Sequence, residues 1–221
     1  MRTLVPPQQQ QLSSSPQSPR LSLPPLTAVL GLDDGWGIRR VVRLSFPNPS
    51  ALAHDPEHTA RLSVYLTDLL RPYGLTLEPG AMSRSGRHGG QSYGEMAEAL
   101  IAAAVPEGEQ IDLLVMAYHV PDITPGRATT TYLSHICPGT PLSFAVSDQG
   151  AGVGLTALRL VQEYARTAGL RRALLLLVEQ CALPYDPGVP VTVPSEDSGV
   201  ALLFGDIRPA ETAQSHARDS T

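Results

Sequence analysis

Short apolar runs alternate with stretches of helical spacing from residue 38 onward. The runs have the length and continuity of strands; they are Ile38–Phe46, Ile111–Tyr118, Leu142–Val146, Ala173–Val178 and Asp197–Phe204. Apolar residues at helical intervals predict helices over Leu62–Tyr73, Tyr93–Val105 and the segment that ends at Gly169. Strands that alternate with helices predict an α/β fold, with a layered, mainly parallel sheet and helices on both faces.

The stretch from Pro141 to Glu179 contains the clearest local pattern. A strand-like run meets the turn SDQGAG, which opens into a helix and is followed by a second apolar run. This is the pattern of a βαβ unit, in which a helix joins two parallel strands. Ligands and nucleophiles commonly lie at such a turn, because the first backbone N–H groups of the helix are unpaired there. The turn is therefore the first candidate site.

Composition limits the remaining interpretations. The chain has 221 residues, 42% of them hydrophobic, which is enough for one sizeable core. Its 16 basic and 21 acidic residues leave a net charge of −5, so we expect no nucleic-acid or membrane partner. No apolar stretch reaches the roughly 20 residues of a membrane span, and the N-terminus lacks the apolar core of a signal peptide. We expect a cytoplasmic protein.

Three segments are expected along the chain. Residues 1–26 are rich in Pro, Gln and Ser, which predicts a disordered leader. Residues 27–205 carry the strand and helix pattern and predict one globular domain. Residues 206–221 become polar and predict a flexible tail.

Four motifs, taken in order, resemble a known family. They are IDLLVMAYHVPD, LSHICPGTPLSFAVSDQGAGVGLTAL, ALLLLVEQ and DSGVALLFG, and the resemblance covers roughly Gly90 to Gly205. Their order and spacing are similar to the N-terminal half of the thiolase fold, and most closely to β-ketoacyl synthases of the ketosynthase III type. The resemblance implies a thiolase-like half domain whose central helix is buried.

The turn departs from the family pattern at the nucleophile. In the family, a cysteine at the start of the central helix takes the acyl group from a thioester. The resemblance aligns Gly150 with that cysteine, directly after Asp148 and Gln149, so the nucleophile is missing. Chain-length-factor subunits of aromatic polyketide synthases are similar in this respect, with Gln in place of Cys. The family's C-terminal half, which supplies a catalytic His and a second His or Asn, has no counterpart in the sequence.

The lack of a counterpart to the family's C-terminal half has a consequence for the oligomeric state. Apolar residues surround much of the expected central helix, which predicts cover on more than one side; they are Val153, Leu155, Leu158, Leu160 and Val161. A half domain alone would expose more apolar surface than a monomer tolerates. We therefore expect a homo-oligomer or a heteromeric complex with a ketosynthase-like chain. The resemblance adds acyl carrier protein or acyl-coenzyme A as candidate partners.

Four side chains outside the turn are candidate catalytic groups. Cys137 and Cys181 are candidate displaced nucleophiles, although a buried small hydrophobic residue explains either. The family resemblance places His119 and His135 beside the loop that borders the acyl pocket. Either is a candidate acid or base, or else a structural histidine.

A Gly/Ser-rich loop carries three candidate phosphate contacts, Arg84, Arg87 and His88. Guanidinium groups suit the phosphate of coenzyme A or of a phosphopantetheine arm. An exposed surface loop has the same composition, so both interpretations stay open.

Two motifs elsewhere resemble cofactor or metal sites. Gly150, Gly152 and Gly154 approach a dinucleotide fingerprint, but the third glycine comes one residue early. His54 and His58 have the spacing of a metal-binding pair, but no third ligand is near in the sequence. We expect neither a cofactor nor a metal.

The sequence favours a catalytically degenerate ketosynthase-like protein, which acts as a partner or chain-length-influencing subunit in polyketide or fatty-acid-like biosynthesis. One alternative is a small acyl-thioester enzyme, such as a decarboxylase, hydrolase or acyltransferase, that is completed across a subunit interface. Another is a binding module for acyl carrier protein or coenzyme A.

Overall fold

The computed structural model describes residues 35–48, 55–77, 91–122, 128–181, 183, 185 and 187–207. Within these residues it contains five strands and four α-helices, and each strand expected from the sequence is present. The expected leader at residues 1–26 lies outside the described residues, as does nearly all of the expected tail. Among the described helices, none has both the length and the apolar character needed to span a bilayer.

The helices and strands follow the predicted order. The strands are β1 (Trp36–Ser45), β2 (Leu113–Ala117), β3 (Leu142–Val146), β4 (Ala173–Glu179) and β5 (Ser198–Asp206). The α-helices are α2 (Pro56–Leu70), α3 (Tyr93–Ala104), α4 (Thr129–Ile136) and α5 (Val153–Ala168). Two short 3₁₀ helices, η3 (Arg71–Tyr73) and η4 (Gly150–Gly152), follow α2 and precede α5.

The sheet has the strand order β1-β5-β4-β2-β3. β2 pairs in parallel with both β3 and β4, whereas β5 pairs antiparallel with β4 and with β1. Four described strands therefore run in one direction and β5 runs in the other, which confirms an α/β fold with a mainly parallel sheet. The predicted βαβ unit is formed by β3, α5 and β4, and β2 lies between its two strands.

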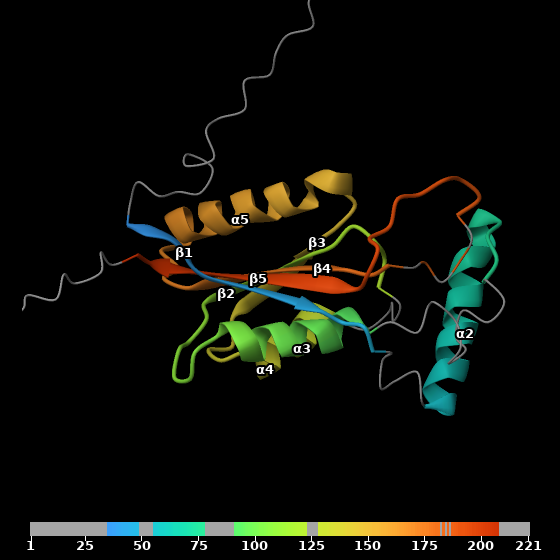
Figure 1. Ribbon diagram of the computed structural model, residues 1–221, viewed down its shortest axis with the longest axis horizontal. Coiled ribbons are helices and arrows are strands. Elements are labelled where there is room, and N and C mark those ends of the chain that lie inside the picture. The colour runs from blue at the N-terminus through green and yellow to red at the C-terminus, as the bar shows by residue number, and fades with distance from the viewer. Residues whose placement is uncertain are drawn as a thin grey trace, which may run out of the picture.

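Helices cover both faces of this sheet (Figure 1). α3 and α4 pack on one face, where their apolar residues form a core with β2, β4 and β5. α5 packs on the other face against β2, β3 and β4. β2 lies between these layers and all five of its residues are buried, which explains its continuous apolar sequence.

Local sequence signals set the helix ends. The Asp55 side chain accepts the backbone N–H groups of Glu57 and His58 and so caps α2. Ser92 and Glu95 form a capping box at the start of α3. α2 begins at Pro56, one and a half turns before the predicted start, because its first turn is polar and carries no apolar periodicity.

Within this chain α5 is covered on one side only. Its buried residues are Val153, Ala157, Leu158 and Val161, whereas Leu155 is 55% exposed. At about 100° per residue, Leu155 points away from the sheet side of the helix. The described residues therefore do not provide the expected cover on more than one side, and a fully buried central helix would require a partner.

A tight loop between α4 and β3 generates a stability prediction. Gly139 has φ of 99°, and a Cβ there would lie 2.5 Å from the backbone oxygen of Ile111. Because that neighbour is backbone at the entry to β2, the Gly139→Ala variant should lose more than about 2 kcal/mol of unfolding free energy in urea titrations.

Gly108→Ala provides the control for this prediction. Gly108 also has a positive φ, of 79°, but no atom lies within 4 Å of a Cβ placed there. The Gly108→Ala variant should lose only about 1 kcal/mol of unfolding free energy, which is the cost of a left-handed backbone at a residue with a Cβ. Equal losses in the two variants would show that the contact with Ile111 is not the cause.

Candidate functional site

The carboxyl ends of β2, β3 and β4 meet at one end of the sheet, because the three strands are parallel and aligned. β5 runs in the opposite direction, so its first residues lie at the same end. The backbone N–H of Tyr118 donates to the carbonyl oxygen of Val146, 3.2 Å away, and joins the ends of β2 and β3. The connections that follow these strands form the candidate site.

The turn after β3 reverses the chain sharply. Asp148 has φ of 60° and Gly150 has φ of 52°, so two of its residues are in the left-handed region. The Ser147 hydroxyl donates to Asp148 Oδ2 at 3.1 Å, and Gln149 Nε2 donates to the Asp148 carbonyl oxygen at 3.4 Å. Both Asp148 and Gln149 are exposed. The turn thus presents a carboxylate and an amide where the family resemblance places a thiol.

The helix start that follows this turn has no side-chain cap. Gln149 precedes η4 and its side chain accepts no helix N–H group, while Gly152, which precedes α5, has no side chain to do so. The first turn of α5 also carries no acidic residue. η4 already pairs two N–H groups here, because Gly152 donates to the Gln149 carbonyl oxygen at 3.1 Å and Val153 donates to that of Gly150. The positive end of the helix dipole is what this start offers to a carbonyl oxygen or an oxyanion.

The Glu179 carboxylate organises the neighbouring connection. Its two oxygens accept the backbone N–H groups of His119, at 2.6 Å, and Val120, at 3.0 Å. The Tyr93 hydroxyl donates to the Val120 carbonyl oxygen at 2.5 Å. Burial, followed by the charges of Glu179 and Asp122, raises the pKa of Tyr93 far above its usual range, so Tyr93 stays a donor. Because Glu179 is occupied by backbone groups, the dinucleotide interpretation loses the carboxylate that would bind a ribose.

Cys181 and Asp197 form a second polar contact at this end of the sheet. The backbone N–H of Cys181 donates to Asp197 Oδ1 at 2.7 Å, and Asp197 is buried at the entry to β5. Burial raises the pKa of the Cys181 thiol, and its hydrogen bond to the Asp197 carboxylate raises the pKa further. The thiolate is the nucleophilic form, so this environment disfavours nucleophilic attack at neutral pH.

The remaining candidate catalytic residues are divided between the two ends of the sheet. His119 is exposed and follows β2, at the end that holds the turn. His135 lies in the last turn of α4, and Cys137 is buried directly after that helix, where the chain approaches the start of β3. Burial raises the pKa of Cys137 to about 11. The structure therefore brings His119 and Cys181 to the turn and places His135 and Cys137 at the opposite end.

The candidate binding residues are only partly described. Arg84, Arg87 and His88 lie outside the described residues. His58 lies in the first turn of α2, and His54 is also outside. Among the described residues, no group of three or more His, Cys, Asp or Glu side chains has the arrangement of a metal site.

The sequence patterns missed the parts played by Tyr93 and Asp197. Both contact residues that are distant along the chain, as Tyr93 does with Val120 and Asp197 with Cys181. The available signal was an acidic residue directly before the buried strand β5. A buried carboxylate requires hydrogen-bond partners, and its position predicts that they lie at the strand end.

Comparisons with known proteins give structural likeness only. No protein-family model and no curated protein matches the chain. Among solved structures, it is similar to the acyltransferase ChlB3, with 19% identity and a TM-score of 0.48 over 79% of this chain and 51% of that one. It is also similar to the HMG synthase of the curacin pathway in complex with acetyl donor-ACP, with 15% identity and a TM-score of 0.45 over 78% and 41%.

A third similar structure is a variant of OleA from Xanthomonas campestris, with 11% identity and a TM-score of 0.43 over 77% of this chain and 58% of that one. The chain spans 51%, 41% and 58% of the lengths of these three structures. The names describe those proteins, and the function of this chain is inferred below from its own residues.

The Cys181 environment predicts a change in thiol reactivity. Asp197→Asn removes the carboxylate charge but keeps an oxygen that can accept the Cys181 N–H, so the pKa of the thiol should fall toward its ordinary value. Alkylation of Cys181 by iodoacetamide at pH 7.5 should become severalfold faster, because more thiolate is present. Peptide mass spectrometry measures the rate.

Cys137 in the same samples is the internal control, and its slow alkylation should not change. An unchanged or slower rate at Cys181 would show that Asp197 does not hold the thiol protonated. The wild-type rate at Cys181 should still rise with pH through neutrality, because a raised pKa leaves the thiol mostly protonated there.

Proposed function

We propose that the chain is a catalytically degenerate, ketosynthase-like half domain that acts as a partner or chain-length-influencing subunit in polyketide or fatty-acid-like biosynthesis. The proposal combines the family resemblance of four ordered motifs with the α/β arrangement of the strands that they form. Its role is to complete a pocket or an interface, with Gln149 offering amide hydrogen bonds beside the helix start.

One observation carries this proposal: the turn before α5 keeps the form of a nucleophile site and has no nucleophile. The strand, the sharp turn and the uncapped helix start are all present. The exposed polar side chains of the turn are those of Asp148 and Gln149. The nearest cysteine along these strand ends, Cys181, has a pKa raised by burial and by Asp197.

A partly uncovered sheet face supports the partner role. α5 packs on β2, β3 and β4, while on the same side β1 and β5 present apolar residues without a described helix above them. We call this the open sheet face; it consists of Val41, Leu177, Val200 and Leu202. Leu155 adds an exposed apolar position on the side of α5 that points away from the sheet. Val41 is 60% exposed and Leu155 is 55% exposed, while the other three are partly buried. An apolar surface formed by a strand pair and a helix is suited to another α/β layer.

The oligomeric state tests this role. We expect a dimer or larger assembly of the chain, or a complex with a ketosynthase-like chain, at micromolar concentration in analytical ultracentrifugation. A double variant, Val41→Glu with Leu155→Glu, should dissociate the assembly, because it places two charges in an apolar interface.

Val64→Glu is the matched control for the double variant. Val64 is 63% exposed on α2, which lies beyond the end of the sheet, away from the open sheet face (Figure 1). It should leave sedimentation unchanged. A wild-type chain that sediments as a monomer, alone and beside a coexpressed ketosynthase-like chain, would sink the partner role.

The uncapped start of α5 favours one rival function. In this rival function, the backbone of the SDQGAG turn and the positive end of the helix dipole act as an oxyanion hole for an acyl thioester, and a second copy of the chain supplies the acid or base. An acyl-thioester hydrolysis assay separates the two functions. Thioester consumption by the purified chain alone would favour the enzyme, whereas consumption only beside a second chain supports the partner role.

A further inference from the structure

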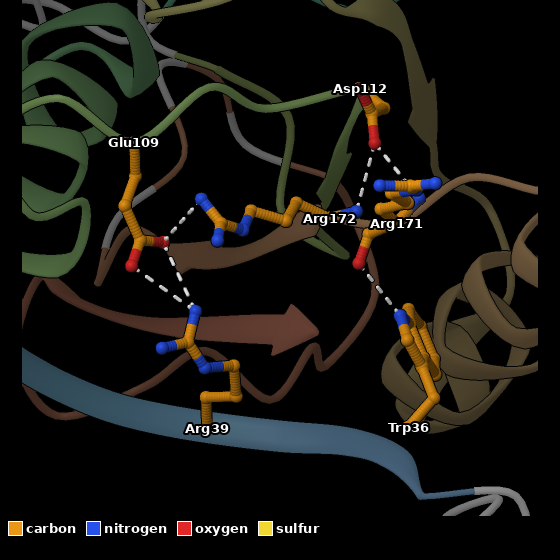
Figure 2. A network of polar contacts seen from close by, with 6 residues as sticks. All are labelled: Trp36, Arg39, Glu109, Asp112, Arg171 and Arg172. Atoms are coloured by element: carbon orange, nitrogen blue, oxygen red, sulfur yellow. Dashed lines mark hydrogen bonds and ion pairs between the residues drawn. The ribbon is translucent and has the colours of Figure 1, made fainter. Parts of the chain in front are cut away.

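A polar cleft lies at the end of the sheet opposite the candidate site, where β1 and β4 begin and β5 ends. It has a volume of about 770 Å³, and its polar lining consists of Arg39, Gln110, Asp112, Arg171, Arg172 and Asp206. Figure 2 shows that the three arginines reach this region from two elements: Arg39 from β1, and Arg171 and Arg172 from the segment just before β4. The proposed function assigns no role to these side chains.

An irregularity in β1 directs the Arg39 side chain across β5, toward the cleft. The pairing of β1 with β5 shifts register between Ile38 and Arg40, which leaves Arg39 at a bulge. Across the pair lies Gly205, where a Cβ would come within 2.8 Å of Arg39 Cδ. The missing side chain at Gly205 thus leaves room for Arg39 to cross β5.

Arg39 and Arg172 share a single carboxylate. Arg39 Nη1 lies 3.1 Å from Glu109 Oε1 and 3.2 Å from Oε2, and Arg172 Nη1 lies 3.3 Å from Oε2. Two guanidinium groups on one carboxylate leave one positive charge in excess. Each guanidinium also keeps N–H groups that Glu109 does not use, because an arginine side chain has five.

Arg171 contributes a guanidinium with no partner among the described residues. The contacts of Arg171 are made by its backbone: its N–H donates to Asp112 Oδ2 at 2.8 Å, and its carbonyl oxygen accepts from Trp36 Nε1 at 2.9 Å. Asp112 Oδ2 also accepts the backbone N–H of Arg172 at 2.9 Å. Backbone hydrogen bonds therefore hold the Asp112 side chain and fix the backbone of Arg171. The Arg171 guanidinium remains available to bind a ligand.

We propose that this cleft binds a small molecule through a phosphate group, with Arg171 as the main contact and Arg39 and Arg172 as supporting contacts. Arginine suits this task because its planar fork matches two phosphate oxygens at once. The exposed carboxylates of Asp112 and Asp206 both line the cleft and oppose an anion, so they limit the affinity. A bound phosphate would join β1 to the segment before β4.

Titration calorimetry with inorganic phosphate and with pyrophosphate, at constant ionic strength, tests this site. Arg171→Gln removes the guanidinium and keeps both backbone contacts, so the variant should unfold at the wild-type temperature without ligand. Its affinity should fall by about tenfold or more, because charge-assisted hydrogen bonds are lost. Asp206→Asn should bind severalfold more tightly, because an opposing charge is removed.

Arg159→Gln is the matched control. Arg159 is exposed on α5, outside the cleft, and its loss should change the affinity by less than about twofold. Absence of saturable binding of either anion to the wild-type chain would overturn the proposal. Equal affinities of the wild-type chain and Arg171→Gln would also overturn it. Either result leaves the partner role of the open sheet face unchanged, since that face is separate from the cleft.

Discussion

The parallel pairing of β3, β2 and β4 is the constraint on which the candidate site depends. Leu113 of β2 is aligned with Leu142 of β3 and with Ala173 of β4, so the three strands stay level to their carboxyl ends. β2 is buried on both faces, so a slip of its pairing by one residue in one direction would place the charged Asp112 in the fully buried position of Leu113. The turn after β3 and the connections after β2 and β4 are neighbours only because of this alignment.

The polar groups at that end of the sheet are mostly engaged in holding the backbone. Glu179 binds two N–H groups of the connection after β2, and Asp197 binds the N–H of Cys181. The exposed Asp148 and Gln149 side chains of the turn are not engaged in this way, and the helix that follows the turn has no side-chain cap. We propose that this arrangement is the frame of an acyl-transfer site without the attacking group, and that the open sheet face is the place for the chain that would complete it.

The strands were the most predictable part of the fold. β2 and β4 differ from prediction by one or two residues, because a strand covered on both faces is a continuous apolar run. β3 has the predicted limits, although it is an edge strand and none of its residues is buried. The start of α2 was missed, since its first turn contains Pro56 and Glu57 and no apolar periodicity. An exposed apolar surface was expected for a half domain, but which side of α5 would be uncovered was not predicted. Counting apolar residues such as Leu155 does not show on which side of the helix they lie.

The candidate site also has a part that the sequence predicts and a part that it does not. Asp148, Gln149 and Gly150 were predictable because a strand, a turn and a helix follow one another within a short stretch. The bonds from His119 to Glu179 and from Cys181 to Asp197 join residues that are 60 and 16 positions apart. No local pattern encodes such pairs, because they arise from the order of strands in the sheet. The same holds for the Arg39 contact with Glu109.

Intact-mass spectrometry after incubation with acyl-carrier-protein and acyl-coenzyme A thioesters tests the central claim most directly. The claim is that the turn retains the architecture of an acyl-transfer site but no nucleophile. The predicted result is an unmodified chain mass at neutral pH, because both cysteines are held as thiols and no thiol stands at Gly150. A stoichiometric acyl adduct on Cys181 or on any residue of the turn would contradict the account.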